Sequence, residues 1–205
     1  MDRKEDILLK ARRKFSRYGY TKTTMDDIAR DCEITKPTLY HYYAGKADLF
    51  AAVIEHEQNA FFKLVEEATA DVASTAEKLR IYLDMQIKSL QEFLVLGELS
   101  RHAFLDLHPD SVKVLTTCRV REENLLSRWI ADGVRAGEFT VIDCNRTAHI
   151  FFMTFAALRF EGLFLNNPTD DEITDDEAII GTLSEEFRSF VDLFLQGLRT
   201  RRDIK

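Results

Sequence analysis

The residues of this chain that are best suited to chemistry are hydrogen-bond donors near its start. Thr35 precedes Lys36, Pro37 and Thr38, and Tyr40 follows one helical turn later. A lysine can donate to guanine O6 and N7, while proline and the threonine methyl group can pack on a thymine methyl. When such residues open a helix, they reach base edges in the major groove of DNA. The spacing therefore predicts contact with a nucleic acid.

Two short helices must position these residues. Thr24, with Asp27 three residues later, is a capping-box-like start for a helix that ends near Asp31. Thr35 caps the next helix, in which Pro37 lies in the first turn, where its missing N–H costs nothing. The tight turn between the two helices consists of Cys32, Glu33 and Ile34. With a helix before them, the two form the layout of a helix-turn-helix unit.

The preceding helix is predicted to have a basic outer face. Apolar side chains recur at helical spacing over residues 7–18, and Gly19 then supplies a helix stop. The basic residues between Lys10 and Arg17 more often form a solvated face than a base contact, yet they raise DNA affinity through counterion release. The residues with the spacing of a small core are Phe15, Ile28, Ala29 and Leu39, and Tyr43 is expected to join them.

Charge divides the chain into two parts. Residues 1–46 hold 11 Lys/Arg and 7 Asp/Glu, a net charge of +4, whereas residues 47–205 hold 17 and 28, a net charge of −11. Five of the six tyrosines lie in the first part and 14 of the 15 phenylalanines in the second. The whole-chain charge of −7 argues against a polyanion partner, but the division favours one. We therefore expect a DNA-binding head, residues 1–46, and an acidic body, residues 47–205.

Several other classes of protein are disfavoured. Three scattered cysteines fit a reducing cytoplasm, which is the expected location. The longest apolar run, residues 150–158, is far short of the roughly 20 residues of a membrane span, so no membrane partner is expected. His56 and Glu57 begin like the H-E-x-x-H zinc motif, but Ala60 stands where the second histidine is needed. Without a nucleophile–base pair or metal-ligand spacing, we expect no enzymatic activity, no metal and no cofactor.

Few helix breakers interrupt the body. Glycine and proline together number 11 of 205 residues, which favours long helices and an all-α fold. One helix is predicted from Lys46 to about Ala68 and would link head and body. The further helices are predicted at residues 76–96, 98–107, 110–136 and 144–165, with a last one ending near residue 200.

Three segments make the chain resemble the DNA-binding head of the TetR/AcrR family of transcriptional regulators. They are Thr23-Thr24-Met25-Asp26-Asp27-Ile28-Ala29, Ile34-Thr35-Lys36-Pro37-Thr38-Leu39-Tyr40-His41-Tyr42-Tyr43 and Gly45-Lys46-Ala47-Asp48-Leu49. The resemblance covers residues 5–53. Glu33 departs from the pattern, because the family usually has glycine in this turn.

The residues expected to bind DNA follow from the motif and the resemblance together. Thr24 and Lys46 stand at helix starts, where hydroxyl, ammonium and backbone N–H groups can hold phosphates, and Tyr42 is expected as a third phosphate contact. The full set is Thr24, Thr35, Lys36, Pro37, Thr38, Tyr40, His41, Tyr42 and Lys46.

The resemblance further implies a small-molecule cavity in the body and a homodimer formed by the last two long helices. The candidate cavity residues are Phe62, His102, Phe104, Trp129, Phe152, Phe155, Glu161 and Phe164. The candidate interface residues are Phe151, Phe187, Phe190, Phe194 and Leu198. Periodicity alone also fits two apolar stripes that close a single monomeric bundle, and ordinary core packing for most of the aromatic residues.

These features predict a ligand-responsive, homodimeric repressor that a small hydrophobic effector releases from a palindromic double-stranded DNA operator. The alternative is a constitutive DNA-binding protein whose body serves only dimerisation or protein contacts. The sequence does not choose between a drug-like effector and an acyl chain.

Overall fold

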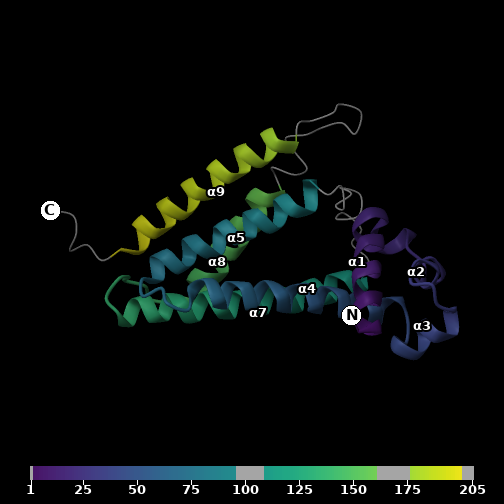
Figure 1. Cartoon of the computed structure of the whole chain (residues 1–205). Helices are drawn as coiled ribbons and strands as arrows, with labels where there is room; N and C mark the ends of the chain where they lie inside the picture. Colours follow the sequence, from purple (N-terminus) through teal and green to yellow (C-terminus); the bar gives the residue numbers. More distant parts are fainter. Residues whose placement is uncertain (1, 96–108, 161–175, 200–205) are drawn as a thin grey trace. The chain divides into compact units, whose positions relative to one another are not determined.

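A computed structural model describes residues 2–95, 109–160 and 176–199, and within those ranges the fold is all-α (Figure 1). The helices are α1 (Arg3–Lys22), α2 (Met25–Asp31), α3 (Lys36–Tyr42), α4 (Lys46–Thr69), α5 (Thr75–Val95), α7 (Pro109–Arg135), α8 (Cys144–Phe160) and α9 (Asp176–Leu198). The predicted helix-turn-helix, linking helix and long body helices are confirmed. The helix predicted at residues 98–107 lies outside the described residues.

The chain divides into two compact units. One comprises Met1–Lys63 with Phe93–Cys118, and the other comprises Leu64–Glu92 with Arg119–Lys205. Helices α4, α5 and α7 therefore contribute residues to both units. The boundary expected after residue 46 remains a prediction.

The core of the first unit forms where α1, α2, α3 and the start of α4 turn their apolar residues inward. The predicted core residues are all buried: Phe15, Ile28, Ala29, Leu39 and Tyr43. Gly19 interrupts α1 with φ 80° and ψ 167°, a conformation that glycine adopts without a Cβ penalty. Beyond it, the Thr23 hydroxyl donates to the Gly19 carbonyl at 2.7 Å, so the bend is fixed by a buried hydrogen bond.

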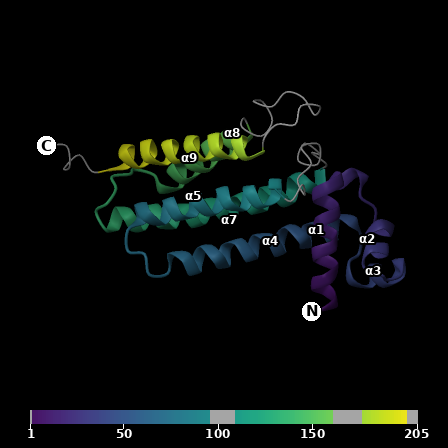
Figure 2. The same ribbon diagram turned by 45° about the horizontal axis from the view of Figure 1, so that its top comes forward.

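The second unit has a core of aromatic contacts between paired helices. Figure 2 shows α8 lying beside α9. The Phe151 ring lies 4.9 Å from that of Phe194, and the Phe155 ring lies 4.7 Å from that of Phe187. The apolar stripes of α8 and α9 therefore cover each other within one chain, and the stripe spacing read from the sequence is confirmed.

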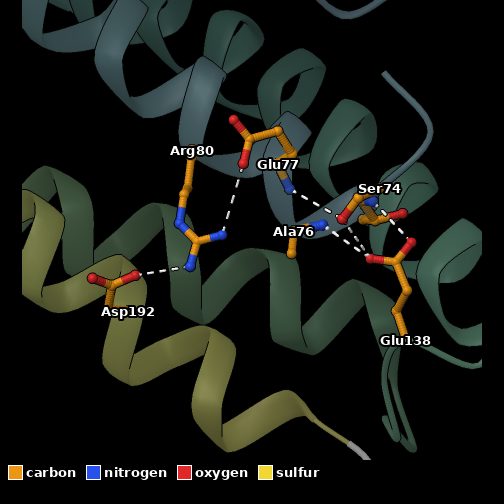
Figure 3. A network of polar contacts seen from close by, with 7 residues as sticks. Ser74, Ala76, Glu77, Arg80, Glu138 and Asp192 are labelled. Atoms are coloured by element: carbon orange, nitrogen blue, oxygen red, sulfur yellow. Dashed lines mark hydrogen bonds and ion pairs between the residues drawn. The ribbon is translucent and has the colours of Figure 1, made fainter. Parts of the chain in front are cut away.

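A carboxylate distant in sequence caps helix α5 (Figure 3). Glu138, in the α7–α8 loop, accepts from the Thr75 N–H at 3.0 Å and the Ala76 N–H at 3.2 Å. The Ser74 hydroxyl also donates to it at 3.0 Å. The first N–H groups of a helix have no partner inside the helix, and a negative charge there is favoured by the helix dipole.

The same loop packs closely against the last turns of α7. Phe139 is buried, and a Cβ on Gly133 would lie 2.5 Å from its ring, so glycine is needed at that position. The next residue, Thr140, donates its N–H to the Leu198 carbonyl at 2.8 Å. The loop therefore connects the ends of α5, α7 and α9.

We expect Glu138→Ala to lower the free energy of unfolding by about 1–2 kcal/mol, the usual effect of removing a helix cap. Urea unfolding monitored by circular dichroism measures this change. Glu138→Gln is the matched control, because it keeps an acceptor oxygen and loses only the charge. The glutamine variant should lose less free energy of unfolding than the alanine variant. Equal losses in the two variants would contradict a role for the side-chain oxygen as acceptor.

None of the described helices combines the length and the hydropathy that crossing a membrane requires.

Candidate nucleic-acid interface

Threonine caps set the starts of both short helices. The Thr24 hydroxyl accepts from the Asp27 N–H at 3.2 Å and donates to the Asp27 carboxylate at 2.5 Å. This bond lowers the pKa of the Asp27 carboxyl. The Thr35 hydroxyl accepts from the Thr38 N–H at 3.3 Å and lies 2.8 Å from the Thr38 hydroxyl. Both predicted caps are confirmed, and their hydroxyls already have partners within the head.

Helix α3 leaves all the predicted contact residues that it carries exposed. Leu39 is fully buried and faces the core. The exposed residues of α3 and its cap are Thr35, Lys36, Pro37, Thr38, Tyr40, His41 and Tyr42. Tyr40 and Tyr42 keep 44% and 38% of their surface accessible, so both lie at the surface of the head.

Lys36 is held by a residue of the neighbouring helix. Its ammonium lies 3.0 Å and 3.1 Å from the two carboxylate oxygens of Asp26, in the first turn of α2. The hydrogen bond to Asp26 raises the pKa of the lysine. Sequence reasoning missed Asp26, because its partner stands ten positions later across a turn.

Lys46 contacts the protein backbone. Its ammonium donates to the Tyr20 carbonyl at 2.9 Å and lies 4.4 Å from the centroid of the Tyr20 ring. The Thr21 carbonyl lies 3.4 Å away. Lys46 therefore joins the start of α4 to the end of α1. The phosphate contact expected of it remains a prediction, and the structural contact had no local signal in the sequence.

The basic face of α1 is largely paired with acidic residues. Lys10 lies 3.1 Å from Asp6, and Lys14 lies 3.1 Å from Asp31. Arg12 lies 3.0 Å from Glu57 of α4. Arg12 and Lys14 have side chains only 23% and 24% exposed and pair with α4 and α2, so these two residues are less solvated than the interpretation as a solvated face implies.

Glu33 occupies the left-handed region, with φ 53°. A residue with a Cβ is disfavoured there by roughly 1–2 kcal/mol, which explains why glycine suits this turn. We expect Glu33→Gly to raise the free energy of unfolding by about 0.5–1 kcal/mol, since glycine also gains entropy in the unfolded chain. Glu33→Ala keeps a Cβ and should give no comparable gain in a denaturant titration. If both variants gained the same free energy of unfolding, the gain would come from removing the Glu33 charge and not from relieving the backbone conformation.

The described cavity candidates lie among core residues. Phe62, Trp129 and Phe155 are buried, and Phe152 is half-buried. The Trp129 ring meets that of Tyr82 at 6.2 Å. The candidates His102, Phe104, Glu161 and Phe164 lie outside the described residues. Among the described side chains, no group of three or more His, Cys, Asp or Glu could hold a metal ion.

The interface candidates fall into two groups. Phe151 and Phe187 are fully buried within the chain, whereas Phe190, Phe194 and Leu198 are half-buried. Three further apolar residues of α8 and α9 are exposed, and their exposed fractions are Ile150 49%, Met153 45% and Leu193 69%. Ile150 and Met153 belong to a helix that is apolar nearly all round, a pattern that predicts cover on more than one side.

Known proteins support the architecture of both units. Residues 7–53 match the family described as bacterial regulatory proteins, tetR family. The HTH-type transcriptional regulator YhgD of Bacillus subtilis is 24% identical over 176 residues, which cover 84% of this chain and 90% of that protein. A transcriptional regulator from Cytophaga hutchinsonii is 26% identical, with a TM-score of 0.76 over 96% of this chain and 98% of that one.

A third likeness concerns the fold alone. FadR from Bacillus subtilis, solved in complex with stearoyl-CoA, has a TM-score of 0.74 at 16% identity over 95% of this chain and 99% of that one. The capped helix-turn-helix, the family match over residues 7–53 and the likeness to YhgD and to the Cytophaga hutchinsonii regulator lead to one conclusion: residues 7–53 form a helix-turn-helix head of the tetR family of bacterial regulatory proteins, on a chain that is similar over most of its length to transcriptional regulators.

Proposed function

We propose that the chain is a homodimeric repressor that reads its operator with α3 and releases it when a small hydrophobic effector binds the body. The observation that carries the proposal is the exposure of Lys36, Thr38 and Tyr40 on α3, while Leu39 of the same helix is buried in the core. A helix presented in this way can place its first turn in the major groove.

A dimer is supported by the outer surface of α8 and α9. Ile150, Met153 and Leu193 are exposed beside the half-buried Phe190 and Phe194. A two-fold axis through this surface would bury them, with Phe151 and Phe187 packed beneath. Since α3 has only seven residues, two heads on a palindrome would also double the contacts to DNA.

The effector we would test first is a long-chain acyl-CoA. The interior of the second unit is rich in aromatic residues, including Trp129 and Phe155, and FadR of Bacillus subtilis binds stearoyl-CoA on a similar fold. An apolar cavity with few polar groups would suit an acyl chain.

Helix α4 is the proposed lever between effector and DNA. Glu57 of α4 pairs with Arg12 of α1, and the next residue, Gln58, donates to the Cys118 carbonyl of α7 at 3.1 Å. A shift of α7 at Cys118 would therefore displace α4 at Gln58, and α4 contacts α1 of the head through Glu57 and Arg12. The effector can release DNA only to the extent that it binds the released geometry more tightly.

Mobility-shift titrations with Lys36→Ala and Tyr42→Ala test the head, on an operator selected by the wild-type protein from random duplexes. Lys36→Ala should weaken binding by about 5- to 150-fold, the range of one good base contact. Lys113→Ala removes an exposed lysine of α7 and is the control with the same change of charge. Unchanged affinity in both head variants would refute the assignment of α3 as the reading helix.

Sedimentation and thermal shift test the other two parts of the proposal. Leu193→Glu should convert the dimer to monomers, whereas Leu64→Glu, at an exposed leucine of α4, should not. Stearoyl-CoA should raise the melting temperature and release the operator, and coenzyme A alone should do neither. A body that gains no stability from acyl-CoA or from apolar drugs would favour the alternative of a constitutive DNA-binding protein.

A further inference from the structure

We infer that Asp26 is a positioning residue for specificity: it holds the Lys36 ammonium at the opening of α3, where the lysine reads a base. The inference rests on the proposed contact of Lys36 with DNA. It assigns a role to a residue of α2 that has no place among the expected contacts.

The geometry of the pair fits this role. Asp26 lies in the first turn of α2 and Lys36 is the first residue of α3, so the ion pair joins the starts of the two helices. Both carboxylate oxygens lie within 3.1 Å of the ammonium. The ammonium has three donors, and one carboxylate engages at most two of them. At least one N–H therefore remains available to a base acceptor while the pair stays intact.

The neighbouring carboxylate has a different task. Asp27 is bound to the Thr24 hydroxyl at 2.5 Å and lies 3.7 Å from Arg30 of its own helix. Asp26 is the residue whose carboxylate crosses to α3. Its side chain and that of Lys36 are 54% and 52% exposed, so the pair contributes little to stability and lies on the surface that would face DNA.

Asp26 affects the specific complex through the order of the Lys36 side chain. A free lysine side chain has many rotamers, and ordering it on a base lowers the affinity gained from the contact. The pair reduces that loss in the specific complex. The Asp26 charge also repels the DNA backbone, but this repulsion lowers specific and non-specific affinity alike and does not change their ratio. The ratio of specific to non-specific affinity should therefore depend on Asp26 through the order of the Lys36 side chain.

The experiment measures this ratio by fluorescence anisotropy at one salt concentration, on the selected operator and on a scrambled duplex. Asp26→Asn should raise affinity for the scrambled duplex. It should lower the ratio of specific to non-specific affinity by at least about threefold, which corresponds to a modest part of the free-energy cost of ordering a lysine side chain. Asp31→Asn is the control, because it removes one negative charge from the head at a residue paired with Lys14. It should change both affinities alike and leave the ratio unchanged.

A double-mutant cycle separates positioning from general charge. In the Lys36→Met background, Asp26→Asn should no longer change the ratio. If Lys36→Met lowers the ratio but Asp26→Asn leaves it unchanged or raises it, Asp26 only repels DNA or sequesters the lysine, and the inference is wrong. If Lys36→Met itself changes neither affinity nor ratio, the failure lies in the proposed function of Lys36.

Discussion

Replacing Phe151 with alanine is expected to lower the free energy of unfolding by about 3–5 kcal/mol, the range for removing a buried phenylalanine. The side chain is fully buried, and its ring lies 5.4 Å from that of Phe190 and 4.9 Å from that of Phe194. Alanine would leave a cavity between α8 and α9 that the paired helices cannot close without moving. Urea unfolding at a fixed protein concentration measures the change, since a dimer's stability depends on concentration.

Phe152→Ala is the control for this prediction, because Phe152 is the next residue of the same helix and is only half-buried. It should lose clearly less than the Phe151 variant. If both variants lost the same free energy of unfolding, the face of α8 that contains Phe151 would not be the one that packs on α9.

Lys46→Met is expected to cost about 2 kcal/mol of stability and to weaken operator binding as a consequence. Hydrogen bonds from a charged donor contribute about 1.5–3 kcal/mol, and the ammonium also lies against the Tyr20 ring. Methionine keeps the length of the side chain but leaves the Tyr20 carbonyl without this donor. Thermal and urea unfolding give the stability, and anisotropy titrations at several salt concentrations give the binding.

The salt dependence shows which role of Lys46 dominates. A lysine that mainly holds a phosphate would leave stability unchanged and reduce the slope of log affinity against log salt by about 0.9. A lysine that mainly joins α1 to α4 would lower stability and leave that slope unchanged. Lys113→Met, at an exposed lysine of α7, should change neither.

The elements that sequence reasoning predicted well are those with local signals. The starts of α2 and α3 follow from Thr24 and Thr35, whose hydroxyls cap residues only three positions later. The buried positions of Phe15 and Leu39 follow from helical periodicity. The exposed surface of α3 could therefore be predicted from the amino-acid sequence alone.

The contacts that escaped prediction join residues far apart in the sequence. The carbonyl that receives the Lys46 ammonium belongs to a residue 26 positions earlier, and only the fold brings the two together. Likewise, the stripes of α8 and α9 indicated which residues are apolar, but not that Phe151 and Phe187 are covered within the chain. Periodicity shows which face of a helix is apolar, but it does not show which element covers that face.

The cap on α5 also bears on the order in which the second unit folds. Thr75 and Ala76 receive their acceptor from a residue 63 and 62 positions away, so the first turn of α5 is completed only after a long chain segment has closed. Such contacts of high sequence separation form late and open early. The amide protons of Thr75 and Ala76 therefore report, by their exchange with solvent, whether the α7–α8 loop is in place against the start of α5.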